Sequence, residues 1–111
     1  MSKEIKVKSK NKRLDLYPKR SEDISWVKLK DEIVVLNLRN GYSYVLNAVG
    51  GFAWLLIDGS RSLEEVLRKI VNRYQIDEDK ARAHLNELMS DLLKRKLVII
   101  HNAKINKLQK R

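Results

Sequence analysis

The sequence predicts a small α+β domain made of a three-stranded antiparallel sheet, three helices and a short C-terminal strand. The first observation behind this fold class is a change in apolar spacing. Up to residue 46 the chain is rich in β-branched and alternating apolar residues, and after residue 47 the apolar period becomes about 3.6. The second observation is length, because 111 residues suffice for one domain with a hydrophobic core. No cysteine is present, which excludes disulfides and thiolate metal sites.

The predicted strands span residues 24–29, 32–38 and 42–46. The first strand alternates imperfectly, whereas the second is rich in Val, Ile and Leu and carries the strongest strand signal. A turn at Lys30-Asp31 joins them. The next turn contains Asn40-Gly41, a pair favoured in tight hairpins because both residues tolerate positive φ. This order predicts an antiparallel meander.

The first helix is predicted at residues 48–57, directly after the third strand. Asn47 is a suitable N-cap, because its short side chain can accept a hydrogen bond from a free N–H of the first turn. The segment is apolar on almost every side, so the rest of the domain must enclose it. Gly59 ends the helix, since glycine readily takes the left-handed conformation found at helix C-termini.

Two further helices and a final extended segment complete the predicted fold. Ser62 and Glu65 form a capping box, after which apolar residues recur at helical spacing up to Tyr74. Asp77 caps the third helix, and residues 97–100 form the short last strand. Two helices joined by a short loop and followed by a β segment resemble a winged helix-turn-helix. The predicted fold is therefore winged-helix-like.

The formal charge of +10 is concentrated in the two ends of the chain. Residues 1–20 carry +6 and residues 101–111 carry +4, whereas residues 21–100 are neutral. We therefore expect a basic, disordered N-terminal arm, a globular domain at 21–100 and a basic C-terminal tail. The chain has no apolar stretch long enough to cross a bilayer and no signal peptide, which predicts a cytoplasmic protein without a membrane partner.

No constellation of catalytic residues is visible in the sequence. His84 and His101 stand far from other strong metal ligands, and Gly50-Gly51 lacks the lysine of a phosphate-binding loop. The carboxylates of Glu64 and Glu78 lie in first helical turns, where capping and the helix dipole explain them. No nucleophile lies beside a base. The sequence thus predicts a protein that is not an enzyme and needs no cofactor or metal.

An ordered set of motifs resembles the PqqD family, the small leader-peptide recognition domains of ribosomally synthesised, post-translationally modified peptides. The set consists of Tyr44-x-Leu46-Asn47, Gly50, Trp54-x-Leu56-x-Asp58-Gly59, Ser62-Leu63-Glu64-Glu65, Tyr74-x-Ile76-Asp77 and the apolar spacing of residues 92–98. The resemblance covers residues 24–100. It implies a non-catalytic domain that binds the leader of a precursor peptide and presents it to a separate modifying enzyme or leader peptidase, with lasso-peptide maturation as one setting.

The resemblance also implies where the leader binds. The leader adds as an antiparallel strand to residues 42–46 and lies between that strand and the helix at 79–94. An edge strand suits this role because its unpaired N–H and C=O groups can bind another chain. The candidate peptide-binding residues are Tyr42, Ser43, Tyr44, Val45 and Leu46 on the strand and Arg82, Leu85, Asn86, Met89 and Leu93 on the helix. On that helix, the predicted core line is Ala81, Leu85, Leu88 and Leu92.

Two other classes of function fit parts of the sequence. A winged-helix DNA-binding protein would explain the helix order and the basic ends. However, Asp77, Glu78 and Asp79 crowd the end of the helix that would enter the major groove, and residues 21–100 have no net charge. Nucleic acid is therefore not the expected partner. A structural protein that pairs its edge strands in a homodimer is the third class, and we expect either a monomer or a weak homodimer.

Overall fold

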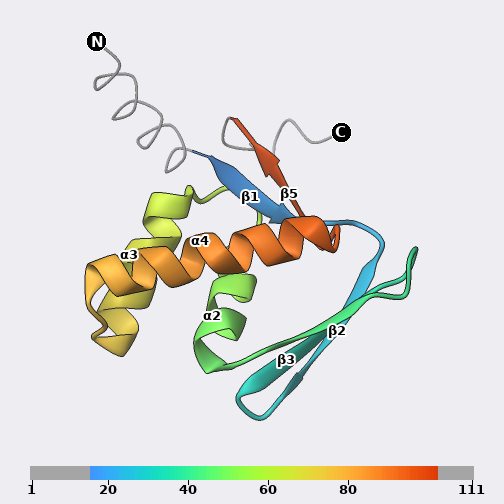
Figure 1. Ribbon diagram of the computed structural model, residues 1–111, viewed down its shortest axis with the longest axis horizontal. Coiled ribbons are helices and arrows are strands. Elements are labelled where there is room, and N and C mark those ends of the chain that lie inside the picture. Colours follow the sequence, from blue (N-terminus) through green and yellow to red (C-terminus); the bar gives the residue numbers. More distant parts are fainter. Residues whose placement is uncertain (1–15, 103–111) are drawn as a thin grey trace.

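The computed structural model describes residues 16–102, which form two small sheets and three helices (Figure 1). Most of the predicted basic arm and tail lies outside these residues. The elements, in chain order, are β1 Tyr17–Arg20, β2 Ile24–Leu29, β3 Glu32–Asn37, β4 Ser43–Leu46, α2 Ala48–Leu56, α3 Leu63–Tyr74, α4 Glu78–Lys94 and β5 Val98–His101.

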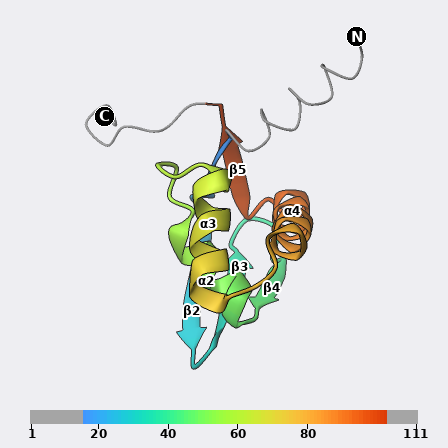
Figure 2. The same ribbon diagram turned by 90° about the vertical axis from the view of Figure 1, so that its left-hand side faces the viewer.

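The main sheet is antiparallel and has the strand order β2-β3-β4. Three helices and the C-terminal strand β5 follow it, so the predicted α+β fold class is confirmed. Figure 2 shows β4 on the side of this sheet that lies nearest to α4. None of the helices among residues 16–102 is both long enough and apolar enough to cross a membrane.

The second sheet pairs β1 with β5 and was not predicted. Residues 17–20 were assigned to the basic arm, and His101 to the C-terminal tail. In the structure Tyr17 pairs with His101 and Arg20 with Val98, in antiparallel register. Pro18 is fully buried in this sheet, and its carbonyl accepts a hydrogen bond from Gly59 N. The partners lie about eighty residues apart, so local periodicity contains no signal for this pairing.

The predicted helix caps are present. The Asn47 side chain accepts from Gly50 N at 2.8 Å, and Ser62 and Glu65 form the capping box. Asp77 accepts from Lys80 N at 3.1 Å at the start of α4. These side chains satisfy backbone N–H groups that have no partner inside the helices.

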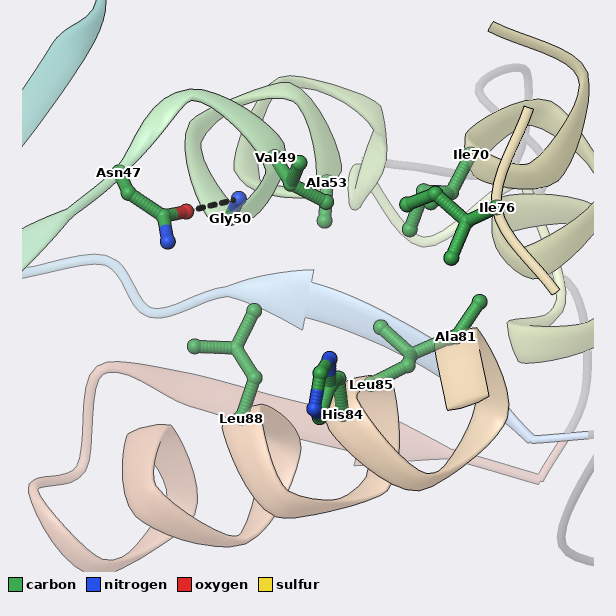
Figure 3. Close-up of a pocket in the computed structure, with 10 residues that line it drawn as sticks. All are labelled: Asn47, Val49, Gly50, Ala53, Ile70, Ile76, Ala81, His84, Leu85 and Leu88. Atoms are coloured by element: carbon green, nitrogen blue, oxygen red, sulfur yellow. Dashed lines mark hydrogen bonds between the residues drawn. The ribbon is translucent and has the colours of Figure 1, made fainter. Parts of the chain in front are cut away.

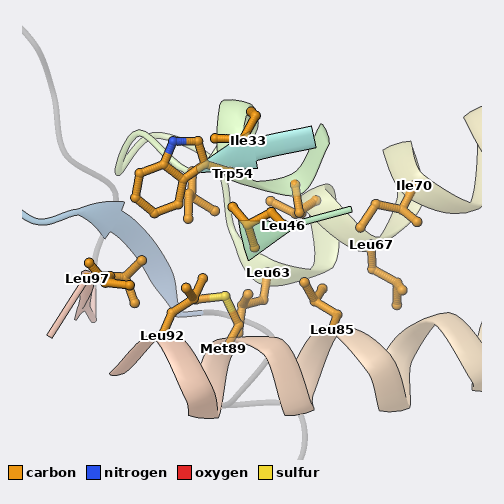
Figure 4. Packing of buried hydrophobic residues seen from close by; sticks show 14 of the residues in the cluster. Ile33, Leu46, Trp54, Leu63, Leu67, Ile70, Leu85, Met89, Leu92 and Leu97 are labelled. Carbon is orange, nitrogen blue, oxygen red and sulfur yellow. The ribbon is translucent and has the colours of Figure 1, made fainter. Parts of the chain in front are cut away.

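One hydrophobic core joins the inner face of the main sheet to all three helices (Figure 4). Trp54 on α2 is fully buried, as the enclosed apolar helix predicted. Ile33 and Val35 on β3 contribute the face of the sheet, and Leu67 on α3 and Leu92 on α4 cover the other sides. α2 is thus held between the sheet and the other two helices, and its position brings its N-terminus beside the end of β4.

Candidate functional site

The outer edge of β4 has unpaired backbone groups among the described residues, because β3 is the only strand beside it in its sheet. The register pairs Val35 with Tyr44 and Ile33 with Leu46, and Asn37 N donates to Tyr42 O at 2.8 Å. In an antiparallel pair, every second residue bonds to the partner strand and the residues between them point the other way. Tyr42, Tyr44 and Leu46 therefore bond to β3.

The remaining residues of β4, Ser43 and Val45, point their N–H and C=O groups away from β3. Both side chains are exposed, and Val45 exposes 57% of its surface. An edge of this kind can accept an additional strand through main-chain hydrogen bonds. Two residues thus offer two donors and two acceptors in the plane of the sheet.

Tyr44 connects this edge strand to α4. Its hydroxyl donates to Asp91 Oδ2 at 3.0 Å, and the Arg95 guanidinium lies 4.8 Å from the centre of its ring. Burial raises the pKa of Tyr44, and the hydrogen bond to Asp91 raises it further. Asn37 Nδ2 also donates to the carbonyls of Arg95 and Lys96, at 3.1 and 3.0 Å. These contacts hold the C-terminal part of α4 at a fixed distance from the sheet.

A pocket of about 310 Å³ lies where β4 ends and α2 begins (Figure 3). Asn47, Val49, Gly50 and Ala53 line it from the α2 side. Four residues of α4 face them across the opening: Ala81, His84, Leu85 and Leu88. Two isoleucines, Ile70 and Ile76, close one end of the pocket. Most of these side chains are apolar. The pocket can therefore hold an apolar side chain of a chain that follows β4.

The predicted strand residues divide between the two faces of the sheet. Leu46 is buried in the core at 2% exposure, and Tyr44 is half-buried against α4. Ser43 and Val45 face the opposite side, while Tyr42 precedes β4 and is exposed. All five still belong to the segment that forms the open edge.

The predicted residues of α4 lie differently from the expectation. Leu85 and Met89 are each only 4% exposed and belong to the core, so Met89 rather than Leu88 continues the buried line. Arg82 forms ion pairs with Glu64 of α3 and with Glu78, which places its contacts between two helices rather than at β4. Asn86 is half-buried, and Leu93 is 41% exposed.

The face of α4 beside β4 and the pocket carries His84, Leu88 and Asp91, and Arg95 follows at the C-cap of the helix. These residues follow the spacing i, i+4, i+7 and i+11 of one helical face. Sequence reasoning assigned Leu88 to the core and gave His84 no role. The sequence signal for this face is one apolar residue among polar and charged residues at helical spacing. The apolar pattern alone does not distinguish such a face from one that is simply exposed to solvent.

Within residues 16–102, no group of three or more His, Asp or Glu side chains is arranged to hold a metal ion. The geometry that distinguishes this region is instead an open strand, a helix fixed beside it and an apolar pocket at one end.

Comparison with known proteins agrees with this geometry. The family model described as coenzyme PQQ synthesis protein D (PqqD) matches residues 32–98. A solved structure described as TbiB1 in complex with the TbiA(beta) leader peptide is similar, with a TM-score of 0.66 and 28% sequence identity over 72% of this chain and 93% of that chain. No protein with curated annotation matches.

The fold and the site define a small α+β domain with an open sheet edge next to a helix. Because the matched residues make up more than half of the chain, the chain belongs to the PqqD family. The family predicted from the ordered motifs is thereby confirmed.

Proposed function

We infer that this protein binds the leader segment of a ribosomally made precursor peptide by strand addition to β4. The observation that carries this proposal is the open edge at Ser43 and Val45, next to the wall of α4 that Tyr44 holds in place. Membership of the PqqD family and the similarity to TbiB1, whose structure contains a leader peptide, support it.

Main-chain pairing and side-chain recognition have different roles in this proposal. The groups of Ser43 and Val45 bind the leader backbone whatever its sequence, which gives sequence-tolerant affinity. Alternate leader side chains face α4, and the pocket lined by Leu88 and Val49 takes an apolar one. A leader that is disordered before binding loses about 2–5 kcal/mol of the interaction energy in becoming ordered.

The bound leader is then presented to a separate modifying enzyme or leader peptidase. The domain itself acts as a binding protein without catalysis, and the chemistry takes place on the part of the precursor that follows the leader. Lasso-peptide maturation is one setting for such a protein. Its place in the cytoplasm, where precursor peptides are made, is part of the same proposal.

The proposal is tested by fluorescence anisotropy with a labelled leader peptide from a short open reading frame next to the gene. Val45→Pro removes an N–H that points away from β3, so the fold tolerates the change and the docking donor is lost. We expect at least a tenfold weaker Kd, equivalent to about 1.4 kcal/mol or more.

Lys28→Pro is the matched control. Leu38 N donates to Asp23 O, which fixes the residues of β2 that bond to β3 as Ser25, Val27 and Leu29. Lys28 lies between two of them, so its N–H points to the opposite edge of the sheet. Its leader affinity should equal that of the parent. Equal losses in the two folded variants, or no binding by the parent protein, would contradict strand addition at β4.

A further inference from the structure

The solvent face of the main sheet is largely aliphatic. On β3, Ile33, Val35 and Asn37 face the core with at most 3% exposure, so Val34 and Leu36 point the other way. The register places Val27 beside Val34 and Val34 beside Val45, which forms a row of three valines across all three strands.

Three leucines extend this row along the strands. The outer sheet face carries six aliphatic residues, Val27, Leu29, Val34, Leu36, Leu38 and Val45, with exposed fractions of 51% at Val27, 52% at Leu29, 38% at Leu36, 61% at Leu38 and 57% at Val45. Ser25 and Ser43 lie on the same face beside Leu36, and Glu32 lies beside Leu29. An antiparallel sheet that covers a core on one face usually has polar side chains on the other. None of the described helices covers the outer sheet face (Figure 1). A contiguous apolar patch of this kind marks an interaction surface.

We propose that the outer sheet face binds the same face of a second copy of this chain. Two sheets pack face to face at about 10 Å through interdigitating aliphatic side chains, as in a β-sandwich. The six residues are uncharged, and Val34 lies at their centre, whereas Glu32, the charged residue of β3 on this face, lies at the end of the strand beside Leu29. The centres of two such faces can therefore meet without bringing like charges together. The aliphatic outer sheet face of one copy is therefore a suitable apolar partner for the same face of another copy.

The size of the patch sets the strength of the dimer. Six half-exposed aliphatic residues offer on the order of 500 Å² per copy, below the ~800 Å² per partner of stable complexes. The dimer is therefore weak and depends on concentration.

This arrangement leaves the candidate site open. The backbone groups of Ser43 and Val45 point in the plane of the sheet, whereas the dimer buries the face perpendicular to it. Each dimer thus has two free β4 edges. A dimer formed by pairing the β4 edges would instead block both of them.

Sedimentation equilibrium of the full chain tests the proposal between about 10 μM and about 1 mM protein. The average mass should rise from 13.0 kDa toward twice that value, and the rise should persist in high salt because the contact is apolar. Val34→Glu should stay at 13.0 kDa throughout. The double variant Val27→Thr and Val45→Thr retains β-branched residues and should shift the dissociation constant upward at least tenfold.

Leu93→Glu changes an exposed leucine of α4 and is the matched control, which should dimerise like the parent. Far-UV circular dichroism verifies that each variant is folded. The parent remaining at 13.0 kDa over the whole range would overturn the proposal. So would a folded Val34→Glu that dimerises normally. A dimer lost in Val45→Pro but kept in Val34→Glu would also refute it and indicate edge pairing.

Discussion

At the scale of single residues, the candidate site depends on two side chains, Tyr44 and Leu88, that lie beside or near the open edge of β4. Tyr44 is bound by Asp91 and covered by Arg95, so its position joins β4 to α4. Leu88 projects into the pocket from the same face of α4, half-buried and without the close packing of Met89. In the proposed binding mode, a peptide beside β4 would contact these two residues.

Leu88→Ala should weaken leader binding. The change removes three carbons from the pocket wall, and with the side chain half-buried we expect a loss of about 1 kcal/mol, about fivefold in Kd. Leu93→Ala, on the same helix but 41% exposed, should leave Kd unchanged. Anisotropy titrations of both variants check this. A larger loss in Leu93→Ala would favour the helix face predicted from the sequence.

At the scale of elements, the N-terminal ends of α3 and α4 are joined by an ion-pair network. Arg82 lies 2.6 Å from Glu78 and 3.6 Å from Glu64, and Arg68 lies 3.7 Å from Glu78. Arg82 is one-quarter exposed, so solvent weakens these pairs only in part. The network orients α4 and thereby positions the wall beside β4.

Arg82→Met should lower the free energy of unfolding by about 1 kcal/mol, because an exposed pair is worth up to this much and Glu64 and Glu78 each lose one of their two arginine partners. Leader affinity should stay within twofold of the parent. Urea unfolding measures the first quantity and anisotropy the second. A folded variant with unchanged stability and much weaker binding would show that Arg82 contacts the peptide, as the sequence suggested.

The elements also show how far sequence reasoning reaches. Alternation and the Asn40-Gly41 pair predicted the three strands, and caps at Asn47, Ser62 and Asp77 predicted where the helices begin. On α4 the predicted core line contained Leu88 where the structure buries Met89, because the apolar stripe contains both residues. The spacing indicates that such a wide stripe contacts both the core and a second surface. Which of the two residues faces the core depends on how α2 and the sheet pack against α4, and the sequence of α4 does not contain this information.

At the scale of the whole molecule, the two ends of the domain are joined by the β1–β5 sheet. Arg20 Nη1 donates to Trp54 O at 2.7 Å, which ties β1 to the centre of the core. Leu97, just before β5, and Val98, its first residue, are almost fully buried. A boundary at residue 21, as predicted from charge, would leave this strand out of the domain.

Two truncations test the importance of β1. Deletion of residues 1–15 should leave the Tm nearly unchanged, because β1 and its pairing remain. Deletion of residues 1–20 removes β1, exposes the buried side of β5 and leaves the Trp54 carbonyl without Arg20, so the Tm should fall by about 10 °C or more, on the scale of several degrees for each kcal/mol. Calorimetry of both truncated chains provides the measurement, and equal Tm values would show that β1 is dispensable.

Hydrogen exchange at single amides of β4 tests strand addition most directly. The N–H groups of Tyr44 and Leu46 already bond to β3, so a bound leader should change their exchange little. The N–H groups of Ser43 and Val45 should become protected by about tenfold or more when the leader is added. This alternating pattern, measured by NMR on the complex, is the result that we predict. A leader that binds tightly yet leaves Ser43 and Val45 exchanging as in the free protein would contradict the account.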